Sequence, residues 1–264
     1  MKHALLIGIN YTGTDSELNG CINDVHAVRK TLIEKFGYKT ENIVMLTDNT
    51  PNKPTTQNII NEISNLALKA ISKPNSEFWI HYSGHGASIP DQNSDEADKM
   101  DEVILPIDFE TSGIITDDKL HHLLSFFPKQ TKCTCFFDCC HSGTILDLKY
   151  KYNSNGSEMI DNSKSRIKAK IFMISGCKDI QTSADFYNKK THAWAGAMTT
   201  DFIKTLEENN YEISCVELLK RLRLNLRKDK FAQIPQMTSS FHIKSDTVFC
   251  TSDKSKSSAI IICD

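Results

Sequence analysis

Two adjacent cysteines lie in the segment FFDCCHSGT, residues 136–144, and they are the strongest chemical signal in the sequence. A cysteine at its ordinary pKa is only a few per cent thiolate at neutral pH, so it needs a nearby base before it can attack a carbonyl. His85, which lies between two glycines in HYSGHG, is the best candidate for that base. The pair predicts a Cys-His arrangement for nucleophilic catalysis. Composition alone leaves a buried structural cysteine and an ordinary loop histidine as the alternative.

Short apolar runs alternate with amphipathic helical patterns along the chain. This predicts an α/β fold with a mostly parallel central sheet flanked by helices on both faces. The expected strands are residues 4–9, 42–47, 78–82, 133–137, 170–175 and 247–250, and the expected helices are 23–36, 56–71, 117–127, 196–209 and 215–231. Reactive groups in such sheets gather beyond the carboxyl ends of the strands. Since HYSGHG and DCCHSG each follow a strand, His85 and Cys140 are expected at the same edge.

Alternation along the strand distinguishes the two cysteines. Cys139 shares a face with Phe137, whereas Cys140 shares the opposite face with Asp138. Cys140 lies nearest the strand end and precedes a Ser-Gly turn whose backbone N–H groups could bind an oxyanion. We therefore expect Cys140 to be the nucleophile and Cys139 to be a packed thiol. His141 adjoins the nucleophile, but the same alternation turns it away.

Composition and charge exclude several classes of protein. With 264 residues, 39% of them hydrophobic, the chain can bury the core of one large α/β domain. A formal net charge of -2 gives no general attraction to nucleic acid or to an anionic membrane, and no apolar stretch has membrane-spanning length. Nine cysteines, an odd number of which four crowd one predicted strand, are typical of thiols in a reducing compartment. We expect a cytoplasmic protein without nucleic-acid or membrane partners.

Motifs along nearly the whole chain resemble those of the metacaspases, which are caspase-like cysteine peptidases. The matching segments are ALLIGINYTGTDSELNGCINDV, LTD, HYSGHG, DEVILPIDFETSGIITDD, FFDCCHSGTILDL, ISGCKDIQTSAD, GAMT and QIPQMTSS. The resemblance implies a caspase-hemoglobinase fold over residues 1–264, with a large-subunit-like region 1–149, a short linker 150–168 and a small-subunit-like region 169–264. It also implies a monomeric, type I-like catalytic domain, here without a Pro-rich or zinc-finger prodomain.

The resemblance assigns a role to each candidate site residue. His85 and Cys140 would form a catalytic dyad, and the backbone N–H groups of Gly86 and Cys140 would form the oxyanion hole. Metacaspases cleave proteins after Arg or Lys, and the positions that match their specificity pocket are Cys21, Asp24, Ser83 and Asp138. The two aspartates would then pair with the cation of the substrate. For Asp24, a favourable place near a helix N-terminus is the alternative.

Residues 91–118 form an acidic segment with ten Asp or Glu side chains and one lysine. Such a run is usually a solvated loop, but clustered carboxylates also suit Ca²⁺, which takes six to eight oxygen ligands. By resemblance, the calcium ligands are Asp101, Asp117, Asp118 and Asp147. Calcium is then expected to stimulate activity by ordering a loop beside the substrate cleft.

Two other functions compete with the peptidase. A zinc site built from Cys133, Cys135, Cys139, Cys140 and His141 is disfavoured, because alternation divides these side chains between two faces. A catalytically silent scaffold or decoy that binds partner proteins is the second class, but both dyad positions and both pocket aspartates are present.

Self-cleavage is chemically available in the linker region, which we expect to be a surface loop. Its basic residues are Lys149, Lys151, Lys164, Arg166, Lys168 and Lys170. The short linker favours a dyad that is already assembled in the uncut chain.

Overall fold

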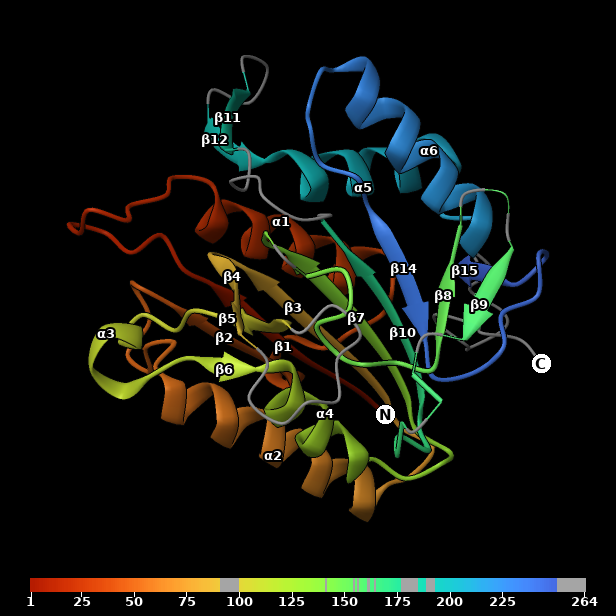
Figure 1. The fold of residues 1–264 in the computed structure, drawn as a ribbon, viewed down its shortest axis with the longest axis horizontal. Helices are drawn as coiled ribbons and strands as arrows, with labels where there is room; N and C mark the ends of the chain where they lie inside the picture. Colours follow the sequence, from red (N-terminus) through yellow and green to blue (C-terminus); the bar gives the residue numbers. More distant parts are fainter. Residues whose placement is uncertain are drawn as a thin grey trace.

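An eight-stranded sheet forms the centre of the computed structural model (Figure 1). The structure describes residues 1–90, 100–140, 142–153, 155, 157–160, 162–163, 165–176, 185–188 and 193–250. The strand order is β2-β1-β3-β7-β10-β14-β8-β9. These strands are β1 (Lys2–Gly8), β2 (Ile43–Thr47), β3 (Glu77–Ser83), β7 (Lys132–Asp138), β8 (Tyr150–Tyr152), β9 (Glu158–Ile160), β10 (Lys170–Ser175) and β14 (Gln236–Ser239).

The first five strands of this order are parallel, and β14, β8 and β9 join them antiparallel. The prediction of a mostly parallel sheet is therefore confirmed. β1, β3 and β7 are apolar through most of their length, as expected for strands that are covered on both faces. Ser83 of β3 is in register with Gly8 of β1 and with Asp138 of β7. The segments that follow these three strands therefore emerge side by side.

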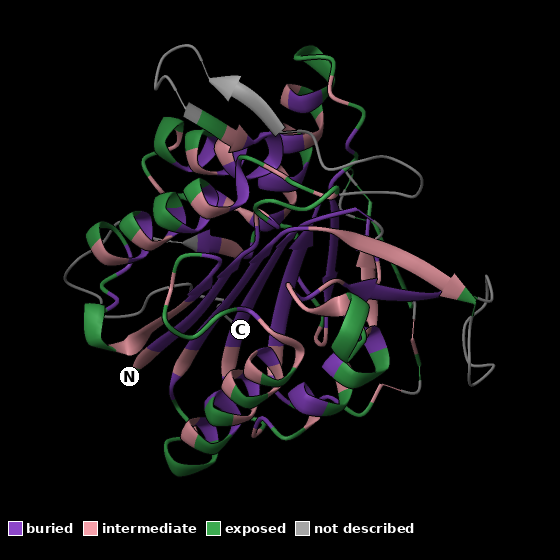
Figure 2. Cartoon of the chain, turned by 90° about the vertical axis from the view of Figure 1, so that its left-hand side faces the viewer, coloured by how far each residue is buried: buried purple, intermediate pink, exposed green. Residues whose placement is uncertain are grey.

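Helices cover both faces of the sheet. On one face lie α1 (Cys21–Glu34), α5 (Ala197–Glu208) and α6 (Cys215–Lys228), and on the other lie α2 (Thr56–Ser72) and α4 (Asp117–Ser125) (Figures 1 and 2). These are the five predicted helices. Each buries one apolar stripe, such as Leu219, Leu222 and Leu226 of α6, in one of two cores separated by the sheet. Side-chain caps from Thr55, Thr116 and Ser214 fix the starts of α2, α4 and α6.

Smaller elements flank this frame. A three-stranded sheet is formed by β4 (Gly86–Pro90), β5 (Met100–Ile104) and β6 (Ile115–Thr116). Two further pairs of strands are β11 (Asp185–Asn188) with β12 (Ala193–Gly196), and β13 (Ile213–Ser214) with β15 (Val248–Cys250). α3 (Phe109–Ser112) and a 3-10 turn (Thr40–Asn42) complete the elements. The predicted strand at 247–250 exists as β15 but lies outside the central sheet, where β14 takes the place beside β10. Phe249 packs instead over the sheet, against Trp79 and Phe202.

Part of the expected linker loop is strand. β8 and β9 extend the central sheet beyond β14, and Lys151 of β8 is in register with Thr238 of β14 and Met159 of β9. The Tyr152 hydroxyl accepts the backbone N–H of Ile243 at 2.8 Å, which ties this edge to the C-terminal region. Short polar strands are common at sheet edges, where one side faces water, so a search for apolar runs does not detect them.

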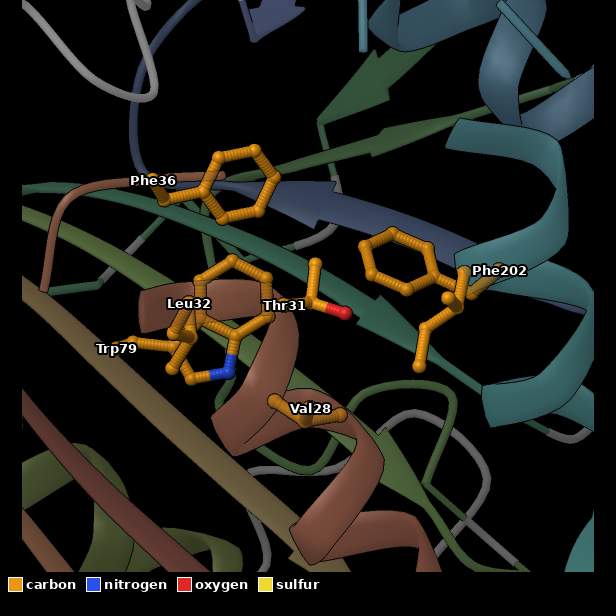
Figure 3. A pocket seen from close by; sticks show the side chains of 7 residues that line it. Val28, Thr31, Leu32, Phe36, Trp79 and Phe202 are labelled. Atoms are coloured by element: carbon orange, nitrogen blue, oxygen red, sulfur yellow. The ribbon is translucent and has the colours of Figure 1, made fainter. Parts of the chain in front are cut away.

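A shallow apolar pocket lies between α1, β3 and α5. It is lined by Val28, Thr31, Leu32, Phe36, Trp79, Phe202 and Ile203, none of which is a predicted site residue (Figure 3). The Thr31 hydroxyl donates to the Ala27 carbonyl of its own helix at 3.1 Å. We therefore assign this pocket to the packing of the helices on the sheet. Within the described part of the chain, no helix combines the length and apolarity needed to cross a bilayer.

Candidate active site

Tertiary contacts, and not strand alternation, position His85. β3 ends at Ser83, so His85 lies in the connection to β4. Its backbone N–H donates to the Tyr11 hydroxyl at 3.0 Å, its carbonyl accepts from the Tyr82 hydroxyl at 2.7 Å, and the rings of Tyr11 and His85 lie 4.8 Å apart. Tyr11 itself has φ of 51°, a left-handed conformation that is uncommon for a tyrosine. These contacts fix both the backbone and the ring of His85.

A backbone carbonyl selects the tautomer of His85. The Nε2 atom of His85 lies 2.8 Å from the carbonyl oxygen of Ser16. A carbonyl oxygen can only accept, so Nε2 carries the hydrogen and Nδ1 of the neutral ring keeps its lone pair. The loop of Ser16 is itself held by Asp48, whose carboxylate accepts the N–H groups of Asn10 and Thr12. The ring is therefore arranged so that Nδ1 can act as a base.

Gly86 brings the segment after β3 against the segment after β7. A Cβ atom at Gly86 would lie 2.2 Å from the carbonyl oxygen of Cys140 and 3.3 Å from the sulfur of Cys139. Such a contact with backbone is not tolerated, so only glycine fits at this crossing. The predicted dyad and oxyanion-hole residues His85, Gly86 and Cys140 therefore lie on adjoining segments.

The two adjacent cysteines differ in their surroundings. Cys139 is fully buried in the core on the α2 and α4 side, where Phe137 also lies, as alternation predicts. Its carbonyl accepts the Ser142 hydroxyl at 2.9 Å, which closes the turn after the strand. Cys140 follows the end of β7 and retains a small exposed fraction of 6%. His141 lies outside the described residues.

Asp24 and Asp138 converge on one point. A Cβ atom at Gly196 would lie 2.5 Å from Oδ2 of Asp24 and 2.7 Å from Oδ2 of Asp138, so this glycine leaves space between two carboxylates. Asp24 comes from the first turn of α1, Asp138 ends β7, and Gly196 ends β12. Both aspartates are almost completely buried. Two neighbouring buried carboxylates concentrate negative charge where a cationic group would be strongly favoured.

Neutral donors hold the two carboxylates in place. Asp24 accepts the Ser83 hydroxyl at 2.8 Å and the backbone N–H of Gly196 at 2.8 Å. Asp138 accepts the N–H of Thr199 at 2.9 Å and its hydroxyl at 2.7 Å. Ser83 thus contacts Asp24, and buried Cys21 begins the helix that carries Asp24. The four predicted pocket residues belong to one neighbourhood at the carboxyl edge of the sheet.

Comparisons with known proteins identify the family. The family described as "Metacaspase, peptidase C14 domain" matches residues 2–149. The chain belongs to the metacaspase family. Metacaspase-1 of Cryptococcus neoformans var. neoformans serotype D (strain JEC21) is 38% identical over 94% of this chain and 64% of its own length. Metacaspase-3 of Trypanosoma brucei brucei is 39% identical over 93% of this chain and 73% of its own length. The metacaspase chain described here thus spans less than two thirds of the Cryptococcus relative.

Solved structures support the fold. A protein from Geobacter sulfurreducens has a TM-score of 0.64 at 24% identity, covering 90% of this metacaspase chain and 93% of its own. Caspase-1 from Spodoptera frugiperda has a TM-score of 0.56 at 12% identity, covering 90% and 86%. At these identities the likeness establishes the caspase fold alone, and it confirms the predicted fold class.

Hydrogen bonds connect Asp117, Glu102 and Asp147 of this metacaspase to the turn after Cys140. Oδ2 of Asp117 accepts the N–H of Glu102 at 2.6 Å, and the Glu102 carboxylate accepts the N–H of Thr144 at 2.8 Å. Burial raises the pKa of Glu102 to about 8, so it is mostly protonated at neutral pH. Asp147 lies in the same turn, where its N–H donates to Thr144 at 2.6 Å. Hydrogen bonds therefore join the start of α4, β5 and the loop after Cys140.

The predicted calcium ligands fit Ca²⁺ in chemistry more than in arrangement. All are carboxylates, the hard oxygen donors that calcium prefers. Asp101, Asp117 and Asp147 are buried and Asp118 is exposed. Within the described residues, however, no three His, Cys, Asp or Glu side chains are grouped so that they could hold a metal ion.

Two kinds of site residue escape sequence reasoning. The Ser16 carbonyl is one, since every residue has a carbonyl and no residue type marks it. The others are Thr199, which donates twice to Asp138, and Gln233, whose Nε2 lies 3.4 Å from Oδ1 of Asp138. Both lie within motifs that carry the family resemblance, Thr199 in GAMT and Gln233 in QIPQ, and this was the available signal.

Proposed function

We propose that this metacaspase is a calcium-stimulated cysteine endopeptidase that cleaves proteins after Arg or Lys. The observation that carries the proposal is the convergence of the Asp24 and Asp138 carboxylates at Gly196, at the edge of the sheet where the His85 and Cys140 segments meet. A buried acidic pocket beside a cysteine and a histidine suits a substrate whose cationic side chain anchors the bond to be cut.

The chemistry follows from the tautomer of His85. Nδ1 of His85 takes the proton of the Cys140 thiol, and the thiolate attacks the substrate carbonyl carbon. Negative charge then develops on the carbonyl oxygen, where the N–H groups of Gly86 and Cys140 stabilise it. The protonated His85 returns the proton to the leaving amine as the C–N bond breaks. Water, deprotonated by the same Nδ1, attacks the thioester, releases the acid and regenerates the thiol.

Calcium acts at a distance from this chemistry in the proposal. The ligand candidate Asp117 is linked by hydrogen bonds through Glu102 to Thr144, a few residues after the nucleophile, and the backbone N–H of Asp147 donates directly to the Thr144 carbonyl. A bound cation would supply positive charge that draws these carboxylates together. We propose that this orders the loop after Cys140 and so raises activity.

A set of three fluorogenic peptides tests the proposed function. They differ only in the residue before the scissile bond, which is Arg, Lys or the neutral norleucine. We expect turnover of the Arg and Lys peptides at least about 100-fold above norleucine, because a neutral chain leaves both carboxylates without a cation. Millimolar calcium should raise these rates over those in chelator. Equal rates in chelator and in calcium would contradict the calcium proposal alone.

A silent scaffold is the alternative function. If wild-type protein turns over none of the three peptides at any pH or calcium concentration while its thermal melt shows a folded domain, the scaffold is favoured. The presence of His85, Cys140 and both pocket aspartates is the reason for preferring the enzyme.

Self-cleavage is expected after Arg166 or Lys168 and not after Lys149 or Lys151. Arg166 and Lys168 are exposed in a segment without regular structure between β9 and β10. Lys151 lies in β8, which is paired on both sides, so it cannot enter a cleft as an extended peptide without leaving the sheet. We expect R166Q/K168Q to abolish cleavage after these two positions over hours, as measured by mass spectrometry. Lys164 lies outside the described residues.

The matched control for this prediction is K149Q/K151Q, which should still be cut. Peptidase activity of R166Q/K168Q should equal that of wild type, because the hydrogen bonds that hold His85 come from Tyr11, Tyr82 and Ser16, which lie outside the linker. An inactive R166Q/K168Q would show that processing is required, and cleavage shifted to Lys149 would show that β8 opens readily.

A further inference from the structure

Gln233 carries an unusual polar atom close to the Asp138 carboxylate. Its side chain is 4% exposed, and Oε1 is buried without a hydrogen-bond partner among the described residues. Nε2 of the same amide lies 3.4 Å from Oδ1 of Asp138. The reverse orientation would set the amide oxygen against a carboxylate oxygen, so this assignment is the favourable one. One acceptor is therefore left without a donor next to the pocket.

Surrounding contacts fix Gln233 in this position. A Cβ atom at Gly176 would lie 3.4 Å from Nε2 of Gln233 and 3.5 Å from Oδ1 of Asp138, which are ordinary packing distances, so this segment adjoins both the amide and the carboxylate. The segment that follows is also held, because Nε of Arg223 donates to the Pro235 carbonyl at 2.7 Å. A buried acceptor without a donor costs free energy, and such groups often mark a place where a ligand supplies the donor.

We infer that Gln233 is a specificity residue that makes the pocket prefer Arg over Lys, an inference that rests on the proposed function. A guanidinium group has five N–H donors spread over a planar fork, whereas an ammonium group has three donors on one atom. An ammonium ion can be satisfied by the two carboxylates alone. The wider guanidinium group reaches Asp24, Asp138 and the amide oxygen of Gln233 together, and only then is the buried acceptor paired.

The test compares kcat/KM for Arg and Lys peptides in wild type and Gln233→Met. Methionine has a similar length and shape but lacks the acceptor. We expect kcat/KM for the Arg peptide to fall about tenfold, the usual size of one hydrogen bond to a charged group, with little change for Lys. The Arg-to-Lys ratio should therefore fall about tenfold. An unchanged ratio, or equal losses on both peptides, would overturn the inference.

Gln236→Met is the matched control. Gln236 is equally buried in the same segment, but its amide donates to the Ile234 carbonyl at 2.9 Å and not to Asp138. It should leave the ratio unchanged, and a fall equal to that of Gln233→Met would contradict the inference. If Gln233→Met does not fold, Gln233→Asn tests the same point, since it withdraws the amide by one methylene.

Failure of this inference is distinguishable from failure of the proposed function. If wild type cleaves both cationic peptides and the ratio does not respond to residue 233, only the inference fails. If wild type cleaves neither, both fail.

A binding measurement that does not depend on turnover uses butylguanidine and pentylamine as probes. Thermal shifts should show that Gln233→Met loses affinity for butylguanidine alone.

Discussion

Cys140→Ala should abolish peptidase activity, whereas Cys139→Ala should keep most of it. Both residues follow the end of β7, but Cys139 is packed in the core, whereas Cys140 keeps a small exposed fraction and its carbonyl lies against Gly86. Loss of a nucleophile removes the acyl-enzyme pathway, so we expect kcat to fall by a factor on the order of 10⁴ or more. Loss of one buried sulfur leaves a small cavity that costs roughly 1 to 2 kcal/mol of folding free energy.

Steady-state kinetics on the Arg peptide and a urea melt of each variant separate these effects. Cys139→Ala should keep kcat/KM within about tenfold of wild type while its unfolding midpoint falls. Cys140→Ala should melt near wild type, because its loss is chemical. If Cys139→Ala is as inactive as Cys140→Ala and remains folded, the assignment of the nucleophile is wrong.

Asp138→Asn should have the second-largest effect, and it should depend on the charge of the substrate. The amide oxygen can still accept from Thr199, so the shape of the pocket is preserved. Removing one partner of a buried charge pair costs about 2 to 5 kcal/mol, which corresponds to a loss in kcat/KM of roughly 30-fold to several thousand-fold on Arg peptides. The slow cleavage of the norleucine peptide should change little, since no cation is involved.

Asp201→Asn provides the matched control for Asp138→Asn. Asp201 is a buried aspartate on α5 that accepts from Asn225 at 3.0 Å, and burial raises its pKa to about 6. The same chemical change there should leave all three peptide rates within about twofold. Full activity of Asp138→Asn on the Arg peptide would exclude the pocket, and equal losses on Arg and norleucine peptides would indicate a structural role.

Local sequence pattern predicts most elements of the fold, because the formation of a helix or a strand depends largely on residues that are close in the sequence. Alternation and helical periodicity identify five strands of the central sheet and all five helices that cover it. The missed strands β8, β9 and β14 are short or polar, and they owe their conformation to pairing partners distant in the sequence. The alternation argument also correctly places Cys139 in the core.

The sequence by itself determined which residue types are present to do chemistry: a cysteine and a histidine at strand ends, with glycines where backbone must approach backbone. Only the tertiary structure decided how they combine. It placed β3 beside β7, aimed the Ser16 carbonyl at His85, and brought Asp24, Asp138 and Gln233 together from a helix, a strand and a loop. The physical reason is that hydrophobic pattern is local, whereas hydrogen bonds to backbone and convergence of buried charges depend on contacts between distant segments.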